Sequence, residues 1–353
     1  MFDRKNLIVL TAVILALTFL SAGKIYAETV QELLAKATEY RNQGKLDESI
    51  AMLNKAVQVD PNSMELYFNR GTLYGAKKEY KKAIVDFSKT IELSPTAQAY
   101  YLRGLAKQYL SDYDAAIADY TKAIELDPAT AAAYTKRGYL YKSRGNADGS
   151  LADFNKALEL DPRDVAAYNG RGYLSLIKSD FDGAMQDFNK ILEIDPQNSD
   201  AYSGIGRAYV VKQDYDQAII NFNKAVGLDA ESDSAYWGRG FCFSQKGEND
   251  MAFADFDKAI KLNPYYVDAY LSRGQVYYKK GQYDKAIADY NKVMELENDY
   301  NLLYYHRAKA WFAKKKFDKA WEDVHKAESL GYNVGSVDAA FIEGLKKASK
   351  REK

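Results

Sequence analysis

MELYFNRGTLYGAKKEYKKAIVDFSKTIELSP, residues 64–95, is a stretch whose pattern recurs along this chain of 353 residues. The six prolines mark its period, because they stand 33 or 34 residues apart except for one interval of twice that length: Pro61, Pro95, Pro128, Pro162, Pro196 and Pro264. A fold with a single core does not need helix breakers at a fixed interval, whereas stacked copies of one supersecondary unit do. The proline spacing therefore predicts a repeat protein.

Glycine and aromatic residues keep the same period. A tyrosine stands four residues before the recurring glycine, and an aromatic ring follows sixteen residues after it, as in Tyr67, Gly71 and Phe87. In the second half of this unit Ile84, Phe87 and Ile91 share one face of an amphipathic helix. The glycine lets two helices approach closely, and the proline ends the second of them. Each period thus predicts a helical hairpin that must stack on its neighbours to bury both faces.

This spacing of aromatic, glycine, tyrosine, alanine, phenylalanine and proline resembles the tetratricopeptide repeat. The resemblance covers residues 30–334 in nine units: 30–63, 64–96, 97–130, 131–164, 165–198, 199–232, 233–266, 267–300 and 301–334. It implies an all-α fold, a right-handed superhelical solenoid of stacked helical hairpins.

Residues 335–353 are expected to supply a C-terminal capping helix and a basic tail. Ser336 is the predicted cap of that helix, and Val337, Ala340, Phe341 and Leu345 are predicted to share its buried face.

The N-terminus, residues 1–27, has the arrangement of a secretory signal. Arg4 and Lys5 precede an uncharged, apolar stretch at 6–23, and Ala27 is a candidate last residue before cleavage. The apolar stretch is also near the length of about 17 residues needed to span a bilayer, so an uncleaved anchor at 6–23 is the alternative. Both alternatives place the repeats outside the cytoplasm, in a periplasm or secreted.

Composition narrows the classes of function. Forty-nine basic residues balance 49 acidic ones, and no basic stripe with interleaved aromatics occurs, so nucleic acid is not an expected partner. A membrane contact is expected only through an uncleaved N-terminal segment. The two histidines, His306 and His325, lack metal-ligand spacing, and no nucleophile or phosphate-binding motif occurs. We expect no enzyme activity, no metal and no cofactor.

The resemblance implies that the first helix of each unit lines a concave groove. Family members that bind chaperone tails clamp a carboxylate with a lysine three residues before the glycine and an asparagine just after it, a pair absent from this sequence. Aromatic residues hold several of those places instead: Phe68, Tyr101, Tyr139, Tyr173, Trp237, Phe241 and Tyr305. Either these rings form a binding surface in the groove or they pack against adjacent units. Arg207, predicted to lie between Tyr173 and Phe241, is a candidate anchor for an anion or a cation–π contact.

A correlation among the nine units predicts an ion pair within the hairpin. Seven units carry an arginine before the recurring glycine position together with an aspartate before the second-helix ring: Arg70 and Asp86, Arg103 and Asp119, Arg137 and Asp153, Arg171 and Asp187, Arg239 and Asp255, Arg273 and Asp289, Arg307 and Asp323. The other two units lack both, with Lys36 and Met52 in one and Ile205 and Asn221 in the other. Such paired variation implies that the two positions are in contact.

These observations favour a non-enzymatic, extracytoplasmic scaffold that binds a protein or peptide segment in its groove. One alternative is a glycan-binding or envelope-assembly factor whose aromatic residues stack on sugar rings. Another is an accessory subunit of an enzyme.

Overall fold

The computed structural model describes residues 28–297 and 301–349, which form α-helices joined by turns, with no strand in those ranges. The predicted all-α class is confirmed. The segment predicted as a signal, 1–27, lies outside the described residues. No helix in the described ranges combines the length and the apolar character needed to cross a membrane.

The helices follow one another in hairpins with nearly constant lengths. The first helix of each hairpin has 13 residues, and the second has 14 in all but the last. The pairs are α2 Val30–Asn42 and α3 Leu46–Val59, α4 Met64–Ala76 and α5 Tyr80–Leu93, α6 Ala97–Tyr109 and α7 Tyr113–Leu126, α8 Ala131–Ser143 and α9 Ala147–Leu160, α10 Val165–Ile177 and α11 Phe181–Ile194, α12 Ser199–Val211 and α13 Tyr215–Leu228, α14 Asp233–Gln245 and α15 Asn249–Leu262, α16 Val267–Lys279 and α17 Tyr283–Leu296, α18 Asn301–Ala313 and α19 Phe317–Ser329.

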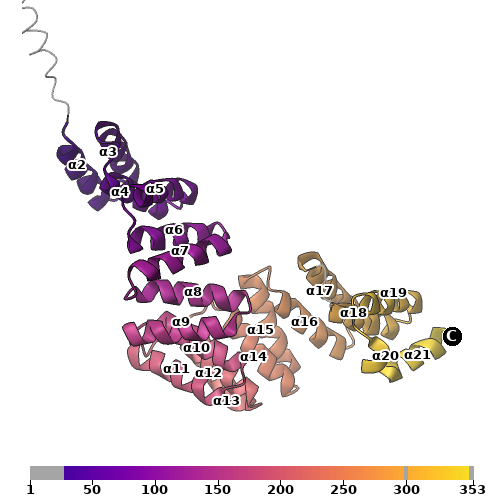
Figure 1. Ribbon diagram of the computed structural model, residues 1–353. Helices are drawn as coiled ribbons and strands as arrows, with labels where there is room; N and C mark the ends of the chain where they lie inside the picture. The colour runs from indigo at the N-terminus through magenta and orange to yellow at the C-terminus, as the bar shows by residue number, and fades with distance from the viewer. Residues whose placement is uncertain (1–27, 298–300, 350–353) are drawn as a thin grey trace, which may run out of the picture. The chain divides into compact units, whose positions relative to one another are not determined.

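The chain divides into two compact units, residues 1–161 and 162–353. In the described part of the first unit, the second helix of a hairpin packs against the first helix of the next: α3 against α4, α5 against α6 and α7 against α8. The same order continues in the second unit, where α13 packs against α14 and α15 against α16. Figure 1 shows the hairpins of each unit stacked in chain order.

Each hairpin turns through one residue in the left-handed region, directly after the C-cap of its first helix. This residue is glycine in four hairpins, such as Gly145 at φ +74° and Gly247 at φ +79°, and another residue in the other five, such as Ser179 at φ +60°. Its amide donates back into the helix, and so does the next amide, as from Asn146 N to Tyr141 O over 2.9 Å. These bonds satisfy carbonyls that the end of the helix leaves open.

A buried ring in the second helix fills the crossing in seven hairpins, whereas the first and the last hairpin have Leu53 and Val324 at this place. Phe154 is fully buried, and a Cβ added to Gly138 would lie 2.9 Å from its Cε1 atom. The next hairpin's first helix covers such a ring as well, because a Cβ on Gly204 would lie only 2.4 Å from Phe188 Cε1. The recurring glycine therefore makes room for the ring within its own hairpin, and Gly204 makes room for Phe188 against the next first helix.

Two short helices close the described part of the C-terminus, α20 Val334–Val337 and α21 Ala339–Ser349. Phe341 and Leu345 are buried in one cluster with residues of α18 and α19. The predicted cap was wrong: Ser336 lies inside α20, where its hydroxyl donates to Asn333 O, and Asp338 accepts from Phe341 N at the start of α21 over 3.0 Å.

The break at Asp338 also changes the helical register, so Val337 and Ala340 are exposed and do not share the face of Phe341.

Candidate functional site

The seven predicted arginine–aspartate pairs lie in contact in the structure. Each guanidinium donates through Nε and Nη2 to both carboxylate oxygens of the aspartate in its own hairpin, over 2.6 to 2.9 Å. The aspartates are buried, for instance Asp187 at 2% exposure. Burial raises the pKa of Asp289 and Asp323, and the paired arginine opposes this shift in each. Bidentate pairs of this kind join the two helices of one hairpin.

The same arginines make a third bond that the sequence analysis missed. Nη1 of Arg137 donates to Thr121 Oγ1 over 3.0 Å, and Nη1 of Arg239 donates to Asn223 Oδ1 over 2.8 Å. Both acceptors belong to the second helix of the preceding hairpin. A signal for this contact exists, since a polar residue directly follows the second-helix ring in these units. One arginine thus links three helices, which makes these residues structural.

The sixth hairpin, α12–α13, replaces this arrangement with a less charged one. Ile205 stands in the place of the arginine and Asn221 in that of the aspartate, and they are 4% and 9% exposed. The side-chain nitrogen Nδ2 of Asn221 donates to Gln217 O over 2.8 Å. Its arginine, Arg207, stands two positions further along α12.

We define the first-helix face of each unit as the surface at the positions three residues before and one residue after the recurring glycine. Its aromatic residues are half-buried. Four of them pack their rings on the buried ring of their own hairpin, with centroids 5.1 to 6.0 Å apart: Phe68 on Phe87, Tyr101 on Tyr120, Tyr139 on Phe154 and Tyr173 on Phe188. Each ring therefore belongs partly to the core and partly to the surface.

The rings of Trp237 and Phe241 pack against each other, with centroids 5.9 Å apart. Trp237 also packs against the buried cluster of Ala252 and Phe256, and its indole nitrogen donates to Ser272 Oγ over 3.2 Å. The indole is consequently held in one orientation by the next hairpin.

Arg207 lies between two rings, one of which differs from the prediction. Its guanidinium carbon is 5.8 Å from the centroid of the Tyr173 ring and 5.6 Å from that of the Trp237 ring, so Trp237 takes the place expected for Phe241. The first helix α12 contacts both α10 and α14 directly, which brings these three side chains together.

Tyr305 is engaged by the C-terminal helices. Its hydroxyl donates to Asp338 Oδ2 over 2.7 Å, and Lys309 Nζ lies 3.1 Å from the same oxygen. Beside it is a pocket of about 300 Å³ lined by Gln275, Tyr278, Lys279, Tyr290, Tyr305, His306 and Lys309.

Burial lowers the pKa of His306 to about 4, and the charge of Lys309 adds to this shift. The imidazole facing this pocket is therefore neutral at pH 7.

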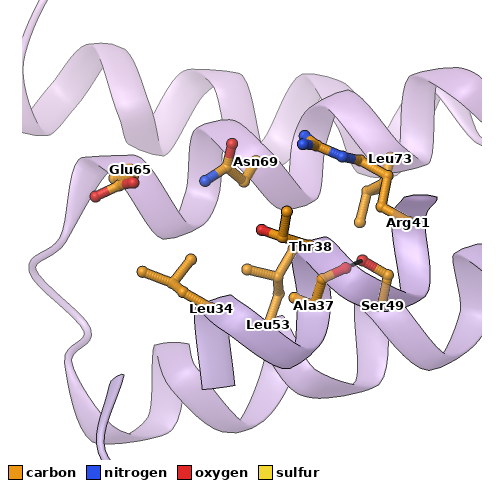
Figure 2. A pocket seen from close by; sticks show the side chains of 9 residues that line it. All are labelled: Leu34, Ala37, Thr38, Arg41, Ser49, Leu53, Glu65, Asn69 and Leu73. Atoms are coloured by element: carbon orange, nitrogen blue, oxygen red, sulfur yellow. Dashed lines mark hydrogen bonds between the residues drawn. The ribbon is translucent and has the colours of Figure 1, made fainter. Parts of the chain in front are cut away.

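A pocket of about 230 Å³ lies among α2, α3 and α4 and is lined by Leu34, Ala37, Thr38, Arg41, Ser49, Leu53, Glu65, Asn69 and Leu73. Figure 2 shows side chains of these three helices around one space, with Leu34 and Leu53 on one side and the polar ends of Arg41 and Asn69 on the other. Thr38 stands here where three later hairpins place a ring: Tyr139, Tyr173 and Phe241. The smaller side chain leaves this part of the first-helix face hollow.

Models of one family match most of the repeat region. Models described as "Tetratricopeptide repeat" match residues 65–96, 97–129, 267–300, 135–199 and 175–238, and one described as "TPR repeat" matches 37–78 and 243–281.

Similar curated proteins match over a short region. The DnaJ protein P58IPK homolog B of Oryza sativa subsp. japonica is 36% identical over 88 residues, which is 24% of this chain and 19% of that protein. Homolog A from the same organism is 34% identical over 91 residues, again 24% and 19% of the two chains. The chain therefore spans about a fifth of the length of these relatives.

Solved structures share the fold at low identity. The APC/C hetero-tetramer Cut9-Hcn1 matches with a TM-score of 0.54 and 15% identity, over 92% of this chain and 88% of that one. Yeast Tom70 matches with a TM-score of 0.54 and 20% identity, over 77% and 59% of the two chains. At these identities the likeness concerns the fold alone.

Proposed function

This chain belongs to the tetratricopeptide repeat family, and on that premise we propose that it is a non-catalytic scaffold that binds a protein segment along its first-helix face. The observation that carries the proposal is the half-burial of the aromatic residues there. Each ring is anchored on the core yet stays partly exposed, so a ligand meets a surface that loses little side-chain entropy on binding.

The chemistry of the face suits a peptide with mixed side chains. Hydroxyl groups and rings at Tyr139 and Tyr173 offer both apolar area and hydrogen bonds. Along the first unit the hollow beside Thr38 and Asn69 offers a place for one larger side chain. Such a surface tolerates varied ligand sequences, as an adaptor requires.

Site-specific photo-crosslinking tests the proposal. The photoreactive residue p-benzoylphenylalanine is placed at Thr72, an exposed position on the first-helix face of α4, and in a matched variant at Val85, which is 67% exposed on α5 of the same hairpin. We expect a defined protein product from the Thr72 variant and none from the Val85 variant. Equal products from both positions would contradict binding along the first-helix face.

The identity of the product separates the alternatives. Enrichment of polysaccharide without a protein would favour the glycan-binding function, in which the same rings stack on sugars. A single catalytic partner in equimolar amount would favour an enzyme accessory subunit.

We also propose that the protein works outside the cytoplasm, as a periplasmic or secreted protein or one held by residues 6–23. The support is the order of Arg4 and Lys5, the apolar stretch and Ala27. N-terminal sequencing of the mature protein from a secreting host tests this proposal. A new N-terminus near residue 28 indicates cleavage, and an intact N-terminus in the membrane fraction indicates an anchor. An intact N-terminus in the cytoplasmic fraction contradicts it.

A further inference from the structure

Ion pairs join consecutive hairpins at the end of the first helix, on the exposed edge of the stack. The basic residue six positions after the recurring glycine position pairs with an aspartate that is the second residue of the preceding second helix. Five junctions show this pair: Lys77 with Asp47, Arg144 with Asp114, Lys246 with Asp216, Lys280 with Asp250 and Lys314 with Asp284. Lys77 also pairs with Glu79 of its own turn over 2.9 Å, and Lys246 with Glu248 over 3.2 Å. In these two junctions the lysine therefore lies between two carboxylates, one from each hairpin.

The junction between the second and third hairpins departs from this pattern at both positions. Leu110 stands in the place of the basic residue, and Lys81 in the place of the aspartate. Lys81 is exposed, and so is Asp112, the acid two residues after Leu110. Neither side chain forms an ion pair or a hydrogen bond with any residue of 28–297 or 301–349. A leucine thus lies between a cation and an anion that both lack a partner in the described chain.

The surface around Leu110 is apolar. Tyr109, in the last turn of α6, is 66% exposed, Leu110 is 41% exposed and Tyr113, at the start of α7, is 37% exposed. Large apolar side chains that gather on a surface and are rimmed by polar groups mark an interaction site. We call these three residues, together with Lys81 and Asp112, the α6 edge.

The α6 edge is held in one conformation by its neighbours. The ring of Tyr109 stacks on the ring of Tyr80 in α5, with centroids 4.6 Å apart and planes 6° apart. The backbone nitrogens of Leu110 and Asp112 both donate to Lys107 O, each over 3.0 Å, so the turn that carries these two residues is fixed. A surface arranged in this way loses little conformational entropy when a partner covers it.

We propose that the α6 edge binds the α6 edge of a second copy of the chain around a two-fold axis beside Leu110. A two-fold axis brings the same surface of both copies together, so that when one residue contacts another, the reverse contact forms as well. The order of cation, leucine and anion is self-complementary under this symmetry. Leu110 meets Leu110 of the second copy, and each Lys81 meets an Asp112.

The charges favour a second copy over other partners. A partner whose surface carries a single sign of charge would place a like charge against either Lys81 or Asp112, and like charges across an interface weaken binding. A second copy offers one charge of each sign at the required places. It thereby supplies each Lys81 with the carboxylate that this junction lacks.

The size of the α6 edge sets the strength of the dimer. It consists of one turn and the residues beside it, so the interface is small and the association is weak and dependent on concentration. A dimer carries two first-helix faces and so binds two segments of the proposed ligand. The dimer itself does not depend on that function.

Sedimentation velocity of the protein recovered from a secreting host tests the proposal, between about 1 μM and 0.2 mM, where a small interface associates. We expect the wild type to show a monomer–dimer equilibrium and Leu110→Asp to remain monomeric, because the variant places two like charges at the axis. The matched control is Ile177→Asp, an apolar residue 71% exposed in the last turn of α10, which should dimerise like the wild type.

Exchanged charges test the two-fold arrangement itself. Lys81→Asp alone and Asp112→Lys alone should each weaken the dimer by roughly 10-fold or more, because both ion pairs become repulsive contacts. An equimolar mixture of these two variants should form a heterodimer with an affinity within about threefold of the wild type, since every charge then faces its opposite.

Three results would overturn the proposal: a wild type that stays monomeric throughout, a Leu110→Asp variant that dimerises as tightly as the wild type, and a mixture that associates no more tightly than Lys81→Asp or Asp112→Lys alone. A monomeric wild type that co-purifies with a different protein only when Leu110 is present would assign the α6 edge to that protein instead. If Leu110→Asp does not fold, the mixture decides the question, because its variants change only exposed side chains.

Discussion

Gly138 lies where the two helices of a hairpin cross, and the crossing leaves no room for a side chain. A Cβ there would lie 2.9 Å from Phe154 Cε1 and 3.3 Å from Asp153 Cβ. We expect Gly138→Ala to lower the free energy of unfolding by about 1–3 kcal/mol, because the ring beneath has to move. Urea denaturation measures this. The matched control is Gly75→Ala, since no atom lies within 4 Å of its Cβ and alanine is the better helix former, so stability should stay equal or rise.

The ion pair of the seventh hairpin can be compared with its natural replacement in the sixth. Arg239→Ile alone leaves the 6% exposed Asp255 without its partner and should cost about 3–5 kcal/mol. The double variant Arg239→Ile with Asp255→Asn recreates the residues of the sixth hairpin, so its cost should fall below the sum of the single changes by about 1–3 kcal/mol.

The control is a double-mutant cycle on the exposed pair of Lys246 and Asp216, in which Nζ and Oδ1 are 2.6 Å apart. Its coupling energy should be under about 1 kcal/mol. Coupling energies of equal size in both cycles would show that burial does not strengthen the pair.

His306 makes stability depend on pH. The unfolded chain takes up the imidazole proton near pH 6.5, whereas burial lowers the pKa in the folded protein to about 4. Between these values the unfolded state binds more protons, so the free energy of unfolding should fall as pH drops from about 7 to 4, by about 3 kcal/mol at most, and then level off. His306→Gln should lose this part of the slope in denaturation curves recorded across the range. Parallel curves for both proteins would contradict the assignment to His306.

At the scale of the element, the sequence pattern predicted helices and their order but not the turn between them. The proline, glycine and ring spacing is periodic because each of these residues meets the same neighbours in every hairpin. The left-handed turn residue is glycine in some hairpins and serine, lysine or glutamine in others, such as Ser179 and Gln213, so no residue type marks it. The backbone conformation is imposed by the stacking of the two helices, which overrides the local preference.

The turn supplies a prediction of its own. Ser179 adopts φ +60°, a conformation that costs a non-glycine residue free energy, so Ser179→Gly should raise the free energy of unfolding by roughly 0.5–1 kcal/mol. The reverse exchange at an equivalent turn, Gly247→Ser, should lower it by a similar amount. Thermal unfolding of both variants checks the pair. A loss of stability in Ser179→Gly would mean that the serine side chain contributes more than the strained backbone costs.

At the scale of the whole molecule, the sequence located the first-helix face better than its details. Spacing alone placed Arg207 in line with Tyr173, because residues one period apart occupy equivalent places in the stack. It could not show that Trp237 rather than Phe241 flanks Arg207, since that depends on side-chain orientation, which the bond from Trp237 to Ser272 fixes. Nor could it show that Ser203 Oγ is left unpaired, because that follows from three-dimensional burial.

The pattern of contacts predicts how a local change spreads through the chain. In the described parts of each unit, a helix packs mainly against helices next to it, or next but one, in chain order. Stability in such an array is approximately a sum of terms within hairpins and between neighbours, so the array has no single core whose loss unfolds every part at once.

Gly138→Ala in α8 should therefore speed amide hydrogen exchange in α7, α8 and α9 while leaving α16 to α19 at the wild-type rate, because exchange reports the local opening free energy. Mass spectrometry of peptides from Gly138→Ala, Gly75→Ala and the wild type, after exchange under native conditions, measures the exchange rate in each helix. Gly75→Ala serves again as the control and should leave α7 to α9 unchanged. Uniformly faster exchange in all hairpins would show that the chain opens as one cooperative body, and the additive description of the array would then be wrong.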